Sequence, residues 1–506
     1  MKKYALISVS DKSGIVELGK ALTEHGFTLL ATGNTAKLLR EQELAVTEVS
    51  DFTGFPEVFD GRVKTLQPKV FGGILFRRDN NEDKIQAEQH AIERIDVVCV
   101  NLYPFAKVAA DSRSTEEELI ENIDIGGPSL IRAAAKNHLY VSVLTSPNQY
   151  RAFISELEQG SGISVASNKK LALEAFAYTA AYDTHIANVL EERFVYSSGD
   201  MRVNHKKIKE LRYGENPHQH AELYGSFFEY FEQIHGKELS YNNILDMVAS
   251  AELVEELPKP ACAIIKHNNP SGVAVGVSSL EAYNKALVCD SVSAFGGIVA
   301  FNTAVDETVA EQLNAIFLEV VIAPEYTEGA LELLKKKKDR RLIIQKRSVL
   351  ENGHSYRQVP GGLLRQETDK ITKDFDNLKQ VTSLPVTPEQ MNDLKLAWVV
   401  AKHAKSNAIV FVKNGATVGI GAGQVSRIDS VKIAGMKAKE FKLELEGAVA
   451  ASDAFFPFPD GVEQIAEYGI KAIVQPGGSV RDDDVFATAE TLGLCMVLTG
   501  IRHFKH

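Results

Sequence analysis

The sequence predicts an α/β protein in two parts: a mainly parallel sheet flanked by helices, followed by two similar α/β units in tandem. Over the first 150 residues, short apolar runs typical of strands alternate with helical patterns, as in parallel sheets with helices on their faces. Further on, an apolar strand, a polar turn and a second strand ending in glycine occur twice, starting at Ala263 and at Ala408. This self-similarity indicates an internal repeat.

The first part alternates strands and helices in order. YALISVS at residues 4–10 is a short strand, and KSGIVELGKALTEHG at 12–26 has helical periodicity and ends at Gly26, a suitable C-cap. The alternation continues with a strand at 27–35, a helix at 35–44, strands at 96–105 and 139–147, and a helix at 170–195.

A polar segment, YSSGDMRVNHKKIKELRYGENPHQ at residues 196–219, changes the character of the chain. We therefore place a domain boundary near residue 198, which gives domains 1–198 and 199–506. The second region is expected to divide again near 370–390, between the two copies of the repeat.

Composition narrows the class of protein. The chain has 506 residues, of which 44% are hydrophobic and 24% charged, and its net charge of −11 disfavours nonspecific nucleic-acid binding. It has no apolar run of about 20 residues for a membrane span, and MKKYALISVSDKSG enters a strand with no secretory signal, so a cytoplasmic location is expected. The four cysteines are scattered singly, which argues against disulfides and CxxC metal pairs.

Lys266 and His267 stand side by side where the first copy of the repeat, AIIKHNNPSGVAVG, passes from strand to turn. The second copy, AIVFVKNGATVGIGAG, lacks the Lys-His pair. A solvated strand end would explain two polar residues there. A purely structural pair would be expected in both copies, so the difference favours a chemical role for the pair.

Two turns in the first part are suited to a phosphate. SVSDKSG at 8–14 and ATGNT at 31–35 each follow a strand and open a helix, so backbone N–H groups and the helix dipole can face an anion. The alternative is ordinary N-capping by Ser10, Asp11 or Thr35.

Three further stretches supply titratable groups: DGRVKTLQPKVFGGIL, NLYPF and ENIDIGGPSLIRAAAKN. The N–H groups near Ile125 and Gly126 precede a helix and could form an oxyanion site. The candidates for proton handling are Lys64, Tyr103, Asp124 and Lys136, although each alone is more often a surface or capping residue. GxGxxG after the first strand, GxxxxGK[ST] and the zinc-deaminase signature HxE…PCxxC are all absent.

Taken together, these stretches resemble the family of bifunctional purine-biosynthesis enzymes, in its bacterial form, that carry phosphoribosylaminoimidazolecarboxamide (AICAR) formyltransferase and IMP cyclohydrolase activities. The motifs run in family order over nearly the whole chain: SVSDKSG, RVKTLQPKVFGGIL, NLYPF, IDIGGPSLIRAAAKN, LRYGENPHQ, IKHNNPSG, IGAGQVSR, SDAFFPF and IRHFKH.

The resemblance implies a methylglyoxal-synthase-like doubly wound domain at 1–198 and two cytidine-deaminase-like subdomains within 199–506. It also implies a homodimer with transferase sites at the subunit interface, 10-formyltetrahydrofolate as co-substrate, no catalytic metal, and neither nucleic acid nor membrane as a partner. Formyl transfer to AICAR would be followed by dehydrative ring closure of formyl-AICAR to IMP.

Site residues carried over from the family fall into two sets. For formyl transfer, Lys266 and His267 handle protons, and Glu319 falls where animal members carry Asp. The other substrate contacts in this set are Arg212, Tyr213, His218, Gly296, Asn407, Arg427, Phe455 and Arg502. For cyclisation, the proton-handling set is Lys64, Tyr103, Asp124 and Lys136, and the ribose phosphate contacts Ser10, Lys12, Gly33, Asn34 and Thr35. The remaining cyclisation contacts are Arg62, Thr65, Asn101, Ile125 and Gly126.

Within the cyclisation set, Asn101 and the backbone of 124–126 are expected to polarise the formyl oxygen. Two other functions stay open at this point. The first part alone could be a methylglyoxal-synthase-type lyase, or the whole chain could be a nucleotide sensor that binds AICAR without turnover.

Overall fold

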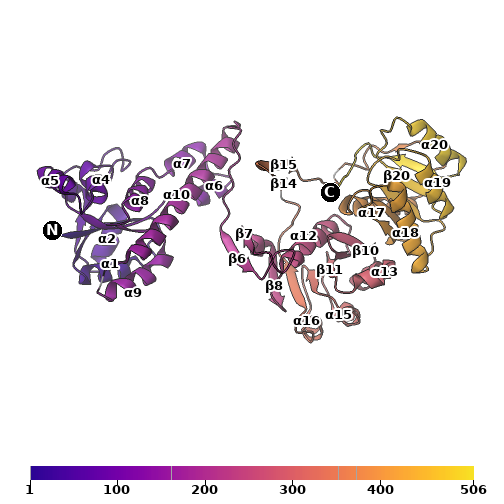
Figure 1. The fold of residues 1–506 in the computed structure, drawn as a ribbon, viewed down its shortest axis with the longest axis horizontal. Coiled ribbons are helices and arrows are strands. Elements are labelled where there is room, and N and C mark those ends of the chain that lie inside the picture. The colour runs from indigo at the N-terminus through magenta and orange to yellow at the C-terminus, as the bar shows by residue number, and fades with distance from the viewer. Residues whose placement is uncertain (1, 161, 352, 372) are drawn as a thin grey trace. The chain divides into compact units, whose positions relative to one another are not determined.

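The computed structural model describes residues 2–160, 162–351, 353–371 and 373–506. The chain divides between Asn204 and His205 into two compact units, unit 1 and unit 2 (Figure 1). This division lies inside the polar segment 196–219. Among the described residues, no helix has the length and apolar character to cross a membrane.

Unit 1 is built around a five-stranded sheet in the order β3-β2-β1-β4-β5, in which every neighbouring pair is parallel. The residues of β1 and β4 are mostly apolar and are buried on both faces of the sheet, as expected of central strands in a parallel sheet. The strands are β1 (Lys3–Val9), β2 (Phe27–Ala31), β3 (Val46–Glu48), β4 (Ile95–Asn101) and β5 (Ser142–Leu144).

The chain order creates a crevice at one edge of this sheet. From β1 the chain moves outward to β2 and β3, and then returns to place β4 on the other side of β1. In open α/β sheets, ligands bind at such a switch point, beyond the carboxyl ends of the strands. The helices of unit 1 are α1 (Ile15–Glu24), α2 (Gly33–Glu41), α3 (Val49–Thr53), α4 (Pro68–Leu75), α5 (Asn81–Gln89), α6 (Phe105–Ala110), α7 (Glu116–Glu121), α8 (Gly126–Lys136), η1 (Pro147–Gln149), α9 (Tyr150–Glu158) and α10 (Val165–Arg193).

Unit 2 contains a twelve-stranded sheet in the order β16-β21-β20-β19-β17-β18-β10-β9-β11-β12-β13-β8. Its strands are β8 (Phe231–His235), β9 (Ala261–Lys266), β10 (Asn269–Val275), β11 (Ile298–Phe301), β12 (Val320–Ala323), β13 (Arg341–Gln345), β16 (Lys379–Gln380), β17 (Ile409–Lys413), β18 (Ala416–Gly421), β19 (Val449–Ser452), β20 (Ala472–Gln475) and β21 (Cys495–Leu498). Two separate hairpins pair β6 (Lys207–Leu211) with β7 (Ala221–Tyr224) and β14 (His354–Val359) with β15 (Gly362–Glu367).

The predicted repeat corresponds to the two halves of this sheet. In the first half, β9 pairs antiparallel with β10 and β11, and β11 continues in parallel to β12 and β13. In the second half, β17 pairs antiparallel with β18 and β19, and β19 continues in parallel to β20 and β21. The halves join where β10 pairs with β18, at Ala274 and Ala416.

Helices cover both faces of the twelve-stranded sheet. Helices α12 (Tyr241–Glu255) and α17 (Pro388–His403) share one apolar core with strands of both halves, in which Met247 and Trp398 are fully buried. Separate cores lie under the remaining helices of each half. These helices are α13 (Ser279–Cys289), α14 (Ser291–Ala294), α15 (Glu307–Leu313) and α16 (Glu328–Leu334) in the first half, and α18 (Arg427–Glu440), α19 (Asp460–Glu467) and α20 (Asp482–Thr491) in the second; α11 (Phe227–Tyr230) precedes them.

Candidate active sites

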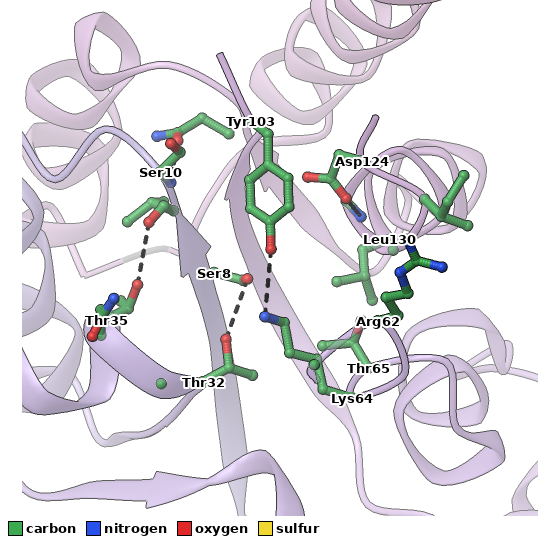
Figure 2. A pocket seen from close by; sticks show the side chains of 18 of the residues that line it. Ser8, Ser10, Thr32, Thr35, Arg62, Lys64, Thr65, Tyr103, Asp124 and Leu130 are labelled. Atoms are coloured by element: carbon green, nitrogen blue, oxygen red, sulfur yellow. Dashed lines mark hydrogen bonds between the residues drawn. The ribbon is translucent and has the colours of Figure 1, made fainter. Parts of the chain in front are cut away.

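A cavity of about 550 Å³ lies in unit 1 at the switch-point crevice. It gathers most of the residues that the sequence motifs single out for cyclisation, although these come from five separate stretches of chain (Figure 2). The predicted residues that line it are Ser10, Lys12, Gly33, Asn34, Thr35, Arg62, Lys64, Thr65, Asn101, Tyr103, Asp124, Ile125 and Gly126.

Two helix N-termini contribute to the cavity wall. Helix α2 begins at Gly33, whose φ of 45° favours glycine, and among the described residues no side chain caps it. Helix α8 begins at Gly126, and its N-cap Ile125 makes no side-chain hydrogen bond to the helix. The Gly127 N–H is bonded to Asp124, and Pro128 has no N–H, so Gly126 carries the N–H group of this first turn that can face the cavity. Backbone N–H groups and helix dipoles therefore favour negative charge at both places.

Lys64, Tyr103 and Asp124 form the titratable part of the cavity. Lys64 Nζ donates to Tyr103 Oη at 3.5 Å, and the two side chains point toward one another in Figure 2, with Asp124 beside Tyr103. Burial raises the pKa of Asp124, although the N–H of Gly127 and the charge of Lys64 act in the opposite direction. A carboxylate with a raised pKa is a stronger proton acceptor near neutral pH.

Gly126 and Gly127, at the start of α8, allow this helix to lie close to Asp124 and Thr65. A Cβ on Gly127 would lie 2.5 Å from Asp124 Oδ2 and 2.6 Å from Leu102 Cδ2, and one on Gly126 would lie 2.9 Å from Thr65 Oγ1. The Gly127 N–H donates to Asp124 Oδ1 at 2.7 Å. The glycines are therefore needed for space as well as for their N–H groups.

Asn101 lines the cavity and holds one of its loops. Its Oδ1 accepts hydrogen bonds from the N–H groups of Ser10 (2.6 Å) and Asp11 (2.8 Å), and its Nδ2 donates to Asp11 O at 2.9 Å. Both polar atoms hold the loop after β1, so the structure shows Asn101 as a positioning residue for this loop. Its role in polarising the formyl oxygen stays a prediction. Because these two amides already have a partner, the turn at Gly33 is the better anion site of the two predicted.

Lys136 lies outside the cavity, whereas Arg62 lies in its wall as predicted. Lys136 is exposed at the last residue of α8 and does not line the cavity. The helix rise places it about 15 Å along the axis from Gly126, which explains the separation. Arg62 lines the cavity but is ion-paired with Glu121, which lowers the pKa of that carboxyl.

Two tyrosines on α10 support the cavity loops and were missed at the sequence level. Tyr182 Oη accepts the Asp124 N–H at 3.0 Å and donates to Asn122 O at 3.2 Å. One turn earlier, Tyr178 Oη accepts the Leu102 N–H at 3.1 Å. The available signal was the four-residue spacing of the tyrosines, which places both on one face of a helix.

Replacing Tyr182 with phenylalanine is expected to lower the rate of ring closure by about 10- to 100-fold, because a small misplacement of a catalytic loop has effects of this size. The substitution removes only the hydroxyl that holds Asp124 and Asn122. IMP formation from supplied formyl-AICAR measures the effect, and Tyr196→Phe, at a 70% exposed tyrosine, is the control. Unchanged turnover would show that the loop holds its position without Tyr182.

In unit 2, Lys266 and His267 lie at the turn between β9 and β10. Residues Lys266 and Asn269 pair across the hairpin, so His267 and Asn268 form a two-residue loop, with φ of 53° and 60°. His267 is exposed, and Lys266 Nζ donates to Phe295 O at 2.6 Å. The imidazole of His267 is therefore exposed, whereas the Lys266 ammonium group is held by a backbone carbonyl.

The Lys-His pair occurs only in the first copy, but the strand register shows that its lysine recurs in the second. Lys413 occupies the position of Lys266 at the end of β17, and its Nζ donates to Glu446 O at 2.7 Å. Phe295 and Glu446 each precede the next strand of their half by three residues. Lysine therefore recurs with the same kind of contact. The two copies differ in the turn, where the first has His267 and the second has Asn414 at the equivalent position.

Of the other predicted transferase residues, Gly296 and Glu319 lie near the end of the sheet that carries the β9–β10 turn, and three more precede the sheet in sequence. Glu319 accepts a hydrogen bond from Asn243 Nδ2 at 2.8 Å and lies 3.6 Å from Arg341. Gly296 has a φ of 71° and donates its N–H to Phe317 O. Three residues follow β6: Arg212 and His218 are exposed, and Tyr213 lies under the Arg212 guanidinium.

In the second half, Arg427 is the centre of a buried polar network. It is ion-paired with Asp453, and the exposed fractions of the two side chains are 7% and 0%. Its NH1 group also donates to Ser452 Oγ (2.8 Å), and its NH2 group donates to Asn407 Oδ1 (2.9 Å). Arg427 therefore fixes Asn407 in place, and its guanidinium is already largely satisfied.

Phe455 is half-buried in the loop after β19, and the exposed Arg502 lies over the ring of Phe504. The first and second halves meet near these residues, because the Lys405 N–H donates to Asn269 Oδ1 at 3.0 Å. Within the described part of the chain, no three His, Cys, Asp or Glu side chains gather as metal ligands would.

Comparison with known proteins matches both parts of the chain. A family model described as MGS-like domain matches residues 14–129, and one described as AICARFT/IMPCHase bienzyme matches residues 134–437. Relatives named bifunctional purine biosynthesis protein PurH cover the whole chain. They include proteins of Persephonella marina (50% identical, 100% of both chains), Chlorobium phaeobacteroides (48%, 100% of this chain and 99% of that one) and Bacillus cereus (48%, 100% of both chains).

These full-length matches set aside the lyase and the nucleotide sensor as alternatives, and they agree with the resemblance carried by the motifs. The chain therefore belongs to the AICARFT/IMPCHase bienzyme family and is a bifunctional AICAR formyltransferase and IMP cyclohydrolase of purine biosynthesis.

Proposed function

We propose that the two activities are divided between the two units, with ring closure in the unit 1 cavity and formyl transfer in unit 2. The observation that carries this division is the cavity itself. Two helix N-termini and the group Lys64, Tyr103 and Asp124 all come from unit 1. A site with every component in one unit needs no contribution from the other.

In ring closure, the ribose phosphate of formyl-AICAR would bind at the N-terminus of α2, with the Thr35 hydroxyl and Lys12 nearby. The carboxamide nitrogen attacks the formyl carbon of the same molecule, so positioning supplies much of the rate. Asp124 accepts the proton released from that nitrogen, and Lys64, held against Tyr103, protonates the former formyl oxygen to give a hydroxyl group. Asp124 then returns its proton to this hydroxyl, which leaves as water, while the former formamide nitrogen gives up its proton to Lys64.

The start of α8 would stabilise charge during this step. As the nitrogen attacks, negative charge develops on the formyl oxygen, and N–H groups at a helix N-terminus are suited to receive it. Ile125 and Gly126 line the cavity at this point. Asn101 acts indirectly, by holding the loop that carries Ser10.

In formyl transfer, the 5-amino group of AICAR attacks the formyl carbon of 10-formyltetrahydrofolate, and the C–N bond to the folate nitrogen breaks. The amine is a weak nucleophile, because its lone pair is delocalised into the ring. We assign His267 as the base that takes its proton, because its imidazole is exposed at the turn and a neutral imidazole can accept a proton. Lys266 would stabilise the oxyanion and help to protonate the folate nitrogen.

The other substrate contacts support this assignment to different degrees. The exposed Arg212 and Arg502 have guanidinium groups available for a phosphate, whereas Arg427 is occupied by Asp453 and holds Asn407. Phe455 is suited to a planar ring. We further propose a cytoplasmic homodimer whose transferase sites include both subunits, a cytidine-deaminase-like fold for each half of unit 2, and a reaction that needs no metal.

The division of activities is tested by expressing residues 1–204 alone. We expect the fragment to fold and to convert supplied formyl-AICAR to IMP at a rate close to that of the full-length chain, because the sheet and its core lie wholly within unit 1. Lys64→Met in the same fragment is the control and should lose the activity. A folded but inactive fragment, beside an active full-length protein, would contradict the division.

A further inference from the structure

The two halves of unit 2 build the same hairpin turn from different residues. His267 and Asn268 have φ of 53° and 60°, and their counterparts Asn414 and Gly415 have φ of 53° and 74°. Two-residue turns with positive φ at both positions favour Asn-Gly, which the second half has. The first half lacks a glycine, so its turn carries more backbone strain.

Both turns are held by an aspartate at the same place. Asp246, the sixth residue of α12, accepts the N–H groups of His267 (3.2 Å) and Asn268 (2.7 Å). Asp393, the sixth residue of α17, accepts those of Asn414 (2.8 Å) and Gly415 (2.7 Å). Both aspartates are half-buried. The two therefore match in their position within the helix, in their hydrogen bonds and in their exposure.

We propose that Asp246 is a positioning residue for formyl transfer, because its two hydrogen bonds hold the strained turn that presents His267. This inference rests on the proposed role of His267 as the base. Asp393 makes the same two hydrogen bonds to the second turn, which carries no imidazole. The two aspartates therefore separate a structural contribution from a functional one within a single chain.

Asp246 and His267 also interact through charge. Burial raises the pKa of Asp246, and the N–H groups of Asn268 and His267 and the charge of His267 act in the opposite direction. When His267 takes a proton from the amine, the same carboxylate stabilises the imidazolium. Asn414 cannot titrate, so the second half has no equivalent of this interaction.

The test compares Asp246→Asn with Asp393→Asn in the full-length protein. Each substitution is isosteric and leaves one of two hydrogen-bond acceptors. We expect Asp246→Asn to lower the kcat of formyl transfer by about 10- to 100-fold, with the KM for AICAR changed less than about threefold, and Asp393→Asn to change kcat less than about threefold. Both variants should unfold at similar temperatures and cyclise formyl-AICAR as the parent does.

A rescue variant distinguishes positioning from general damage. Asn268→Gly gives the first turn the glycine of the second, so it should recover part of the transfer rate when combined with Asp246→Asn. It also provides the comparison with Asp393→Asn if Asp246→Asn alone does not fold. Equal losses from Asp246→Asn and Asp393→Asn, or a parental transfer rate in Asp246→Asn, would overturn the inference.

His267→Asn, assayed in parallel, separates this inference from the proposed function. A parental transfer rate in His267→Asn would refute the assignment of His267 as the base, and the positioning role of Asp246 would be refuted with it. Loss of transfer in His267→Asn beside an unaffected Asp246→Asn would leave the base in place and refute only the positioning role.

Discussion

Replacing His267 with asparagine is expected to reduce formyl transfer by about 10²- to 10⁴-fold, the usual cost of losing a general base. Asparagine is the residue found at the same turn position in the second half, where Asn414 has the same φ of 53°. The turn should therefore keep its shape, and only the imidazole is lost. Tetrahydrofolate released from AICAR and 10-formyltetrahydrofolate measures the effect, while closure of supplied formyl-AICAR should stay at the parental rate.

The reciprocal substitution, Asn414→His, is the matched control, because it introduces an imidazole into the second turn. It should leave formyl transfer unchanged, since Asn414 is not assigned to the site. Near-normal transfer by His267→Asn would show that another group accepts the proton, and our assignment of the base would then be wrong.

Replacing Arg427 with leucine is expected to lower the free energy of unfolding of unit 2 by about 3–5 kcal/mol, the cost of leaving one member of a buried ion pair without its partner. The exposed fractions of Arg427 and Asp453 are 7% and 0%, so water cannot replace the guanidinium without local opening. Asn407 also loses its hydrogen bond from Arg427. The variant should therefore unfold earlier in urea and lose formyl transfer.

The second substitution Asp453→Asn tests the cause of this loss. Added to Arg427→Leu, it removes the buried charge that lacks a partner, so the double variant should be more stable than Arg427→Leu alone. If Arg427→Leu unfolds at the parental urea concentration, the ion pair contributes little, and the network around Asn407 must be held by other contacts.

Local signals predicted much of unit 1. The strands predicted at residues 4–10, 27–35, 96–105 and 139–147 correspond to β1, β2, β4 and β5, because short apolar runs and turn residues report on nearby structure. The last three predictions are too long, and residues 33–35 belong to helix α2 instead. Strand β3 was missed, since its residues Val46–Glu48 are only partly buried and include no apolar run. Helix α10 begins at Val165, five residues before its predicted start.

The chemical roles of residues were harder to predict than their location. Lys136 shares a motif with Asp124, yet a straight helix separates the two ends of that motif. The polar atoms of Asn101 are engaged by a loop 90 residues away in sequence. Tyr182 lies outside every motif, and only the folded chain shows that it contacts Asp124. Such contacts depend on tertiary structure, which short patterns do not encode.

Unit 2 shows the same limit on a larger scale. The repeat was visible in sequence, but the predicted division near 370–390 gave no sign that both copies share one sheet. The recurrence of lysine at Lys413 was also missed, because the comparison treated Lys266 and His267 as one pair. Only the strand register aligns Lys413 with Lys266 and Asn414 with His267.

The pairing of β10 with β18 has a mechanical consequence. The Val275 N–H donates to Gly415 O at 2.8 Å, and the Val273 N–H donates to Thr417 Oγ1 at 2.9 Å in the buried middle of the sheet. Opening the two halves like a hinge would break these bonds and expose the apolar core shared by α12 and α17. A hinge movement between the two halves is therefore disfavoured, and we expect any substrate of unit 2 to enter and leave through movements of loops and side chains.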